Sequence, residues 1–477
     1  MPATMVDAPR PEPGTPRPDR ASVPLARRIV ASILGLALRV FFRRIRFAGL
    51  EHVDPEGPVI FVLNHPNGLI DPGLLLCHAP RRVSFLAKST LFSMPIVGFL
   101  TRSFDSLPVY RQQDQGSDPR QNRATFDAAR DLLLRGGALA LFPEGTSHSD
   151  PKLKPLKTGA ARIALGAATA LEEARPGTVL RIVPAGLYYT DKRTFRSEVL
   201  VAFGPPLEVP RVALDANGEP PREAAKELTD RIGRALSEVT LEADRSEALE
   251  LAARAERILT AAGDSDAKDL ARQLEVRKRL AAGYAYLRRE RPEELDALAM
   301  RVLRYESERI ALGLPADAPS PDAFTIENVT VFALRHTGVI AVLSPLALLG
   351  LVTHYPAYEL VDVIARRGAR SEEDVVSTFK FLSALLLFPL TWGVLAGLAG
   401  RALGWPAALV TLVVLPLAGL SAQLVAERLA VLVGGARALG LFATRKRSLA
   451  WLAEERGAIR EAILALGERI PEDVIRR

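Results

Sequence analysis

His65 and Asp71 are the residues of this chain best suited to acid–base chemistry, and they lie six positions apart. An imidazole accepts a proton near neutral pH, and a nearby carboxylate fixes its tautomer and stabilises the protonated ring. The pair therefore predicts the activation of a hydroxyl group for nucleophilic attack. A plainer interpretation also fits, because Asp71 is well placed to cap a helix that begins at Pro72.

The elements that must position this pair form a repeating pattern. The run at 58–63 carries β-branched and aromatic side chains and ends in Asn, Pro and Gly, which is typical of a buried strand leading into a loop. Further strand-like runs lie at 83–87, 106–110, 138–142, 180–183 and 199–203, with helical patterns at 123–135 and 158–171. This alternation predicts an α/β domain, with a mixed, partly parallel sheet flanked by helices.

Three other polar blocks follow predicted strands. They are Arg111, the turn Glu144-Gly145-Thr146, and the turn Pro184-Ala185-Gly186. Ligands of an open α/β sheet bind outside the carboxyl ends of its strands, so we expect these blocks to converge with His65 at one edge. The planar fork of an arginine matches a phosphate, although a lone arginine is more often simply solvated.

Other side chains bear on the chemistry less directly. Glu144 either orients its loop or contacts substrate, and Lys88 and Lys157 are secondary phosphate ligands. Cys77 is the only cysteine, which excludes a cysteine-based metal site and an intrachain disulfide. The remaining histidines have no partners at metal-ligand spacing, so no metal is expected. A Gly-x-Ser-x-Gly motif is also missing, which disfavours a serine hydrolase.

Composition narrows the choice of partners. The formal charge is +7 and the isoelectric point is about 9.6, which favours anionic partners such as phosphorylated metabolites or an acidic membrane surface. The 8 Tyr and 3 Trp are not interleaved with basic residues in the way that base stacking requires, so no nucleic-acid partner is expected.

The length of 477 residues predicts about two or three structural units. The run at 29–42 is flanked by arginines and is shorter than the roughly 20 apolar residues of a span, which favours an interfacial membrane helix over a buried core helix. We predict a disordered tail at 1–21, the interfacial helix within 22–50, the α/β domain at 51–212, a helical module with a solvated charged face at 213–320, a membrane region at 321–447 and an amphipathic tail at 448–477.

The membrane region contains three apolar runs, at 337–352, 381–400 and 402–425. The last two are long enough to span, and both flanks of the region are basic. By the positive-inside rule both flanks are cytoplasmic, which predicts a spanning hairpin at 381–425. The first run is short and contains Pro345, so we expect a re-entrant or interfacial element; three full spans are the alternative.

The motifs together resemble the glycerolipid acyltransferase family over about residues 55–210. The match consists of His-x-Asn-x-x-x-Asp-Pro from His65, the block at Arg111, Phe-Pro-Glu-Gly-Thr-Ser from Phe142, and Val-Pro-Ala-Gly from Val183. The family usually has four residues between His and Asp, and this chain has five. That spacing resembles the fungal-type glycerol-3-phosphate/dihydroxyacetone-phosphate branch, whose members carry extra membrane segments after the catalytic domain.

The resemblance implies transfer of an acyl group from acyl-CoA or acyl carrier protein to the hydroxyl of glycerol 3-phosphate or 1-acylglycerol 3-phosphate. His65 would be the general base, Asp71 would orient it, and Arg111 and the turn 144–146 would bind the glycerol phosphate. No cofactor beyond the acyl donor is implied. The expected location is a bacterial-type inner membrane or an endomembrane, with several spans and a cytoplasmic active site. The alternatives are another lysophospholipid acceptor, or a non-catalytic membrane scaffold.

Overall fold

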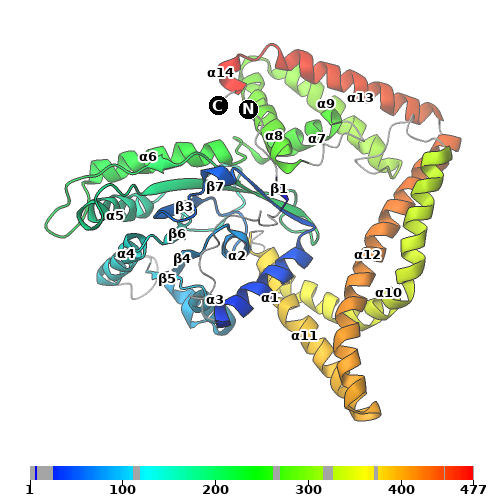
Figure 1. The fold of residues 1–477 in the computed structure, drawn as a ribbon. Coiled ribbons are helices and arrows are strands. Elements are labelled where there is room, and N and C mark those ends of the chain that lie inside the picture. The colour runs from blue at the N-terminus through cyan, green and yellow to red at the C-terminus, as the bar shows by residue number, and fades with distance from the viewer. Residues whose placement is uncertain are drawn as a thin grey trace. The chain divides into compact units, whose positions relative to one another are not determined.

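The computed structural model describes residues 6–7, 25–110, 119–260, 269–314, 326–369, 374–444 and 446–475. The chain divides into two compact units. The first, here called the sheet unit, comprises Met1–Glu242 together with Glu372–Thr378. The second, the helical unit, comprises Ala243–Ser371 and Phe379–Arg477. Figure 1 shows the strands gathered in the sheet unit and long helices in the other.

The sheet unit contains a mixed, partly parallel sheet, as the sequence predicts. Most central pairs are parallel, whereas β7 is antiparallel to β8 and β9. Along the sheet the strands are β1 (Val6–Asp7), β2 (Arg44–Ala48), β8 (Glu198–Phe203), β7 (Arg181–Tyr189), β3 (Val59–Leu63), β6 (Ala138–Leu141), β4 (Val83–Lys88) and β5 (Leu107–Val109), with β9 (Leu207–Glu208) paired to β7.

Helices cover the sheet and supply its core. All five residues of β3 are buried, which explains why that strand is apolar throughout rather than alternating. The main core joins the central strands to α4 (Pro119–Leu134), α5 (Gly159–Ala174) and α6 (Arg222–Val239). A second group consists of α1 (Leu25–Phe41), α2 (Ile70–His78) and α3 (Pro95–Ser103), in which α1 contacts both of the others. Flanking helices were therefore correctly predicted.

Two boundaries differ from those expected. The sheet unit extends to Glu242, because the apolar stripe of α6 packs into the sheet core rather than into the helical module predicted from 213. The segment predicted to contain an interfacial helix ends in strand β2. The alternation of basic and apolar residues in β2 covers only five positions, which is too short to distinguish a strand from the basic end of a helix. The disordered tail predicted at 1–21 lies outside the described residues, except for β1, which pairs with β2.

The strand β7 is longer than its sequence suggests. Pro184-Ala185-Gly186 was expected to be a turn at the strand's end, but β7 continues to Tyr189. A Cβ at Gly186 would lie 1.9 Å from the carbonyl oxygen of Val239, so this glycine permits the end of α6 to approach the strand. The prediction of a turn was wrong, and the extension carries Tyr189 past the end of β3, with which β7 pairs in parallel.

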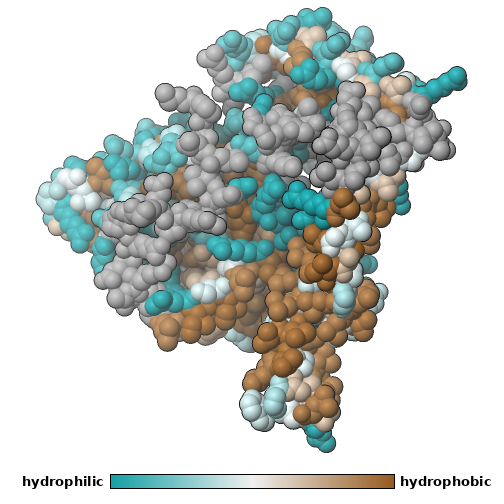
Figure 2. All heavy atoms as spheres, turned by 45° about the vertical axis from the view of Figure 1, so that its right-hand side comes forward, coloured by the Kyte–Doolittle hydropathy of each residue, from teal (hydrophilic) through white to brown (hydrophobic). Residues whose placement is uncertain are grey.

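The helical unit has a polar-faced bundle and three long apolar helices. The bundle comprises α7 (Ser246–Leu259), α8 (Leu270–Glu290), α9 (Pro292–Ala311), α13 (Lys446–Gly467) and α14 (Glu472–Ile475), which share apolar cores. The long helices are α10 (Ile326–Gly368), α11 (Val376–Leu403) and α12 (Trp405–Thr444). Among the described residues these three alone are long and apolar enough to cross a membrane. Figure 2 shows brown apolar side chains over the lower part of the molecule, with paler and teal residues at the lower tip, where α11 meets α12.

The helix α10 differs from the short element predicted at 337–352. It is a continuous helix of 43 residues with Pro345 and Pro356 inside it, and Figure 1 shows it bending along its length. An internal proline removes a backbone hydrogen bond and bends a helix, which accounts for a curved rather than a broken element.

Candidate active site

The loop between β3 and α2 brings His65 and Asp71 together. The distance from His65 Nδ1 to Asp71 Oδ2 is 2.8 Å, so the five intervening residues do not separate the pair. The helix begins at Ile70, two residues earlier than the cap interpretation requires, and its N-cap residue is Leu69. Asp71 therefore lies in the first turn of α2, and its carboxylate faces the histidine rather than capping a helix that starts at Pro72.

The carboxylate of Asp71 is fully buried and has three donors. Oδ2 accepts from His65 Nδ1 and from the backbone N–H of Asn67, at 2.7 Å, and Oδ1 accepts from the hydroxyl of Tyr189, at 2.5 Å. A buried charge needs this degree of hydrogen bonding to remain ionised. Because a carboxylate only accepts, His65 carries its proton on Nδ1 and has its lone pair on Nε2.

Tyr189 is a site residue that the sequence did not reveal. Burial, and then the charge of Asp71, raise the pKa of Tyr189 well above its usual value, so the hydroxyl stays a donor. The neighbouring Asn64 fixes the register: its side chain accepts from the backbone N–H of Leu187 at 2.7 Å and donates to the carbonyl oxygen of Leu187 at 3.2 Å. The signal was present only as two tyrosines that follow the Val-Pro-Ala-Gly block.

The imidazole of His65 is restrained on several sides. Its ring stacks on Phe142, with centroids 3.8 Å apart and planes 7° from parallel. The backbone N–H of His65 donates to Glu144 Oε1 at 3.0 Å, and its carbonyl oxygen accepts from the N–H of His148 at 3.0 Å. The side chain remains 15% exposed, and within the described residues Nε2 has no hydrogen-bond partner. Nε2 is thus the atom that can take a proton from a bound hydroxyl.

Glu144 organises the turn after β6. Its buried carboxylate accepts from the N–H of His65 and from the N–H of Lys154, at 2.8 Å, and pairs with Nε2 of His148. Both oxygens are therefore occupied by protein donors. Of the two interpretations open from the sequence, this geometry favours the loop-orienting role, and it argues against Glu144 as a direct substrate ligand.

The rest of that turn exposes a cation and a hydroxyl. Gly145 has φ +74°, and its N–H donates to the carbonyl oxygen of Phe142 at 3.0 Å, so this expected substrate donor is used by the turn itself. A Cβ at Gly145 would lie 2.7 Å from Nζ of Lys157, which shows that Lys157 lies across the turn. Lys157 and Thr146 are both exposed, and no described carboxylate pairs with Lys157. Lys157 therefore lies beside the turn that contains Thr146.

The other predicted phosphate ligands are less informative. Lys88 is the last residue of β4, which pairs with β6 in parallel, and it is partly buried at the same edge of the sheet. Arg111 lies outside the described residues, so its expected role stays a prediction.

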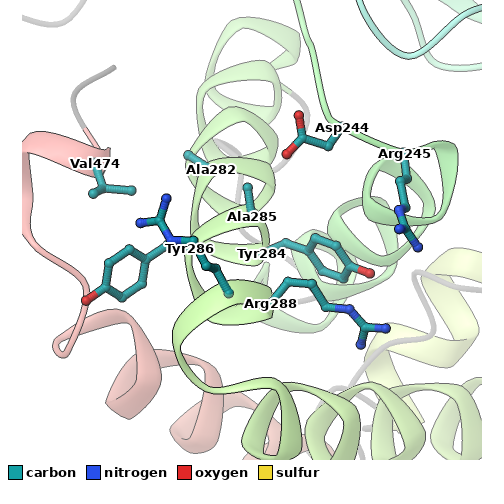
Figure 3. Close-up of a pocket in the computed structure, with 9 residues that line it drawn as sticks. Asp244, Arg245, Ala282, Tyr284, Ala285, Tyr286, Arg288 and Val474 are labelled. Atoms are coloured by element: carbon teal, nitrogen blue, oxygen red, sulfur yellow. The ribbon is translucent and has the colours of Figure 1, made fainter.

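A separate pocket lies in the helical unit and contains none of the predicted site residues. Figure 3 shows tyrosines and arginines from α8 facing it, with Arg245 before α7 and Val474 of α14. Arg288 pairs with Asp296 at 2.5 Å, and Arg289 pairs with Glu290 at 2.8 Å, so these cations are already neutralised locally. The lining offers no histidine to act as a general base.

Comparisons with known proteins show what the chain is similar to. Residues 44–187 match the family model described as Acyltransferase. Glycerol-3-phosphate O-acyltransferase 1 of Saccharomyces cerevisiae is 27% identical over 74% of this chain and 59% of its own length. Glycerol-3-phosphate O-acyltransferase 2 of the same yeast is 27% identical over 57% of this chain and 37% of its own length.

More distant likenesses cover less than half of this chain. A 1-acyl-sn-glycerol-3-phosphate acyltransferase of Chlamydomonas reinhardtii is 30% identical over 34% of this chain and 47% of its own length. The crystal structure of the 1-acyl-sn-glycerophosphate acyltransferase of Thermotoga maritima has a TM-score of 0.31 at 20% identity, over 45% of this chain and 80% of that chain. The chain spans less than two thirds of the length of the curated relatives named here.

The matched domain contains His65, Asp71 and the turn at 144–146, within a mixed sheet flanked by helices. Its relatives are named for acyl transfer to glycerol 3-phosphate and to 1-acylglycerol 3-phosphate. Residues 44–187 are therefore similar to the Acyltransferase family, and the chain resembles relatives named as glycerol-3-phosphate and 1-acylglycerol-3-phosphate acyltransferases.

Proposed function

We propose that this protein is a membrane acyltransferase of phospholipid synthesis. It transfers an acyl group from acyl-CoA or acyl carrier protein to a hydroxyl of glycerol 3-phosphate or of 1-acylglycerol 3-phosphate. The observation that carries the proposal is the geometry of His65. Its Nδ1 is engaged by Asp71 and its ring is stacked on Phe142, while its Nε2 has no partner among the described residues.

The chemistry follows from that geometry. Nε2 of His65 removes the proton of the acceptor hydroxyl as the oxygen attacks the thioester carbonyl carbon. Asp71 stabilises the imidazolium that forms. The tetrahedral intermediate collapses with cleavage of the carbon–sulfur bond, and the thiolate leaves and takes the proton from His65. The acceptor supplies its own nucleophile, so no serine is needed.

The acceptor phosphate would bind beside the turn after β6. Lys157 and Thr146 offer an exposed ammonium and an exposed hydroxyl, and α5 begins two residues after Lys157 with unpaired N–H groups in its first turn. Arg111 and Lys88 are further cationic ligands in this proposal. Charge-assisted hydrogen bonds of this kind are the usual means of holding a phosphate.

Membrane attachment is supported by the face of α1 that does not pack on protein. Leu34 and Leu38 are buried, whereas the stripe at Leu25, Ile29, Ile33 and Leu36 is exposed. The buried interpretation fits one face of this helix, and we propose the interfacial interpretation for the other. An exposed apolar stripe flanked by arginines fits the lipid interface. Phe99 and Ile96 of the contacting helix α3 are exposed as well.

Parity of crossings supports a spanning hairpin. Helices α9 and α13 share an apolar core, so the chain enters and leaves the membrane region on one side. Thr378, near the start of α11, bonds to Leu69 within the sheet unit, so this point lies on the side of the catalytic loop. An even number of crossings is consistent with the shared core of α9 and α13, and the basic flanks at 366–370 and 445–447 favour α11 and α12 as the crossing pair. We therefore propose that α11 and α12 cross, that α10 does not, and that the active site is cytoplasmic.

The test is an assay of the purified full chain in detergent or vesicles. It supplies acyl-CoA or acyl carrier protein as donor, and glycerol 3-phosphate, 1-acylglycerol 3-phosphate or a lysophospholipid without a phosphate monoester as acceptor. We expect turnover with a phosphate-bearing acceptor. Activity only with the third acceptor would favour the alternative substrate. Full complementation of an acyltransferase-deficient strain by His65→Ala would contradict the chemistry.

A further inference from the structure

The catalytic loop between His65 and Asp71 is held at the backbone N–H of Asn67 by Asp71, but it contains groups that its own contacts leave unsupported. Asn67 is fully buried, yet neither its side-chain oxygen nor its nitrogen has a hydrogen-bond partner within the described residues. Gly68 has φ +41°, a conformation that other residues rarely adopt. A loop with an unsatisfied amide and a left-handed residue needs support from elsewhere to keep one conformation.

That support comes from a segment more than 300 residues away in sequence. The backbone N–H of Leu69 donates to Thr378 Oγ1 at 3.0 Å, across 309 positions. A Cβ at Gly68 would lie 2.6 Å from Thr378 Oγ1 and 3.2 Å from the carbonyl oxygen of Asp374, so the segment rests directly on this glycine. The residues Asp374–Thr378 are here called the strap.

The strap is anchored to the same strand that holds Asp71. The hydroxyl of Ser377 donates to the carbonyl oxygen of Lys192, three residues after the end of β7. Ser377 is fully buried and Thr378 is 8% exposed. Tyr189 of β7 donates to Asp71. The strap therefore contacts both the catalytic loop, through Thr378, and the segment that follows β7, through Ser377. The strap clusters with the sheet unit, although α11, which begins at Val376, continues into the helical unit.

We infer that the strap is a positioning element for the His65–Asp71 pair, with Thr378 as its principal contact. The hydroxyl of Thr378 fixes Leu69, and Leu69 fixes the backbone between the base and its orienting carboxylate. The five-residue loop is thereby kept at hydrogen-bonding distance by a helix that belongs to the membrane region. The kinetic part of this inference rests on the proposed function, whereas the structural part does not.

The test compares Thr378→Val with Thr378→Ser in the full chain. Valine keeps the shape but removes the acceptor, which leaves the partly buried N–H of Leu69 unpaired; serine keeps the acceptor. We expect Thr378→Val to lower kcat about tenfold, with KM for the acyl donor changed less than about twofold, and Thr378→Ser to stay near wild type. Thr391→Val is the matched control, because its hydroxyl bonds only Leu387 within α11.

A second readout does not depend on activity. Hydrogen exchange of the peptide covering residues 64–72 is expected to rise about tenfold in Thr378→Val and to stay unchanged in Thr391→Val. Ser377→Ala, which loosens the other anchor, is expected to show a smaller rise in the same peptide. Unchanged exchange in both strap variants, or equal loss of kcat in the two threonine-to-valine variants, would overturn the inference. If the wild-type protein has no acyltransferase activity but exchange of the 64–72 peptide still rises in Thr378→Val, the proposed function is rejected and the positioning role of the strap stands.

Discussion

Two histidine–carboxylate pairs lie side by side in the sheet unit and are used differently. In the loop after β3, Asp71 engages one nitrogen of His65 and leaves Nε2 without a described partner. In the turn after β6, Glu144 pairs with Nε2 of His148, while Nδ1 of His148 accepts from the N–H of Asp150 at 3.2 Å. The first pair has an unoccupied lone pair, and the second has none.

This difference shows that the role of each histidine depends on which of its ring nitrogens lacks a hydrogen-bond partner, and not on residue type alone. His148 donates its backbone N–H to the carbonyl oxygen of His65, and Glu144 accepts from the N–H of His65. The second pair therefore supports the backbone of the first. Since the two pairs share composition and location, matched substitutions in each give a direct comparison of chemistry with support.

The largest effect is expected for His65→Ala. Removal of the base should lower kcat by about 10³-fold, because general-base catalysis supplies roughly 10² to 10⁴. KM for the acyl donor should change little. The measurement is steady-state turnover of the purified protein, and a loss of less than tenfold would break the comparison. The matched variant His148→Ala should lower Tm, and its loss of kcat should be smaller than the loss in His65→Ala.

Asp71→Asn should come next, with a loss of kcat of about 10²-fold. An amide in place of the carboxylate offers Nδ1 a poorer acceptor and no charge to stabilise the imidazolium. The counterpart Glu144→Gln keeps shape but weakens three buried hydrogen bonds, which should cost about 1–3 kcal/mol of stability. Equal losses of kcat in the two variants, at equal folded fractions, would show that the two carboxylates do not differ in role.

Tyr189→Phe tests the support of Asp71 with a smaller expected loss of about tenfold in kcat. The change removes one of three donors and leaves Oδ1 buried without its hydroxyl partner. Tyr305→Phe, in the helical unit, provides a control for loss of a partly buried hydroxyl. Turnover of Tyr189→Phe at the wild-type rate would mean that two donors suffice.

The smallest effect concerns His78, a half-buried histidine whose ring nitrogens are shielded from solvent and have no hydrogen-bond partner in the described part of the chain. Burial, and then the charge of Arg39, lower the pKa of His78 to about 4. Below pH 6.5 the unfolded chain takes up this proton and the folded chain does not, so stability falls as the pH drops from 6.5 to about 4, by at most about 1.4 kcal/mol per pH unit. Thermal unfolding of His78→Gln should show a flatter pH dependence, and an identical slope would contradict the buried neutral state.

Much of the catalytic edge could be predicted from local patterns, because strands reveal themselves by apolar runs and loops by Asn, Pro and Gly. The ends of β3, β4 and β6 lie within a residue of those expected. Tyr189 could not be placed, since its position depends on how far β7 runs past β3. The role of Glu144 depends on which donors reach it, and those come from His65, His148 and Lys154.

The strap was beyond local reasoning for a different reason. Thr378 and Leu69 are 309 positions apart, and nothing in the periodicity of a membrane helix indicates that its first turn contacts a catalytic loop. The same limit applied to α6, whose charged sequence resembled that of the helical module but whose buried stripe packs on the sheet.

The ring of Phe142 has a consequence for regiochemistry. It lies 3.8 Å from the imidazole of His65 and nearly parallel to it, and Asp71 holds the opposite nitrogen, so the ring can neither tilt nor spin. The lone pair of Nε2 then points along one line in the plane of the imidazole, which lies parallel to the ring of Phe142. A base with a fixed line of approach selects among the hydroxyls of a polyol by direction rather than by acidity. In the proposed reaction, the hydroxyl that becomes esterified is therefore set by how the phosphate end is anchored relative to that line.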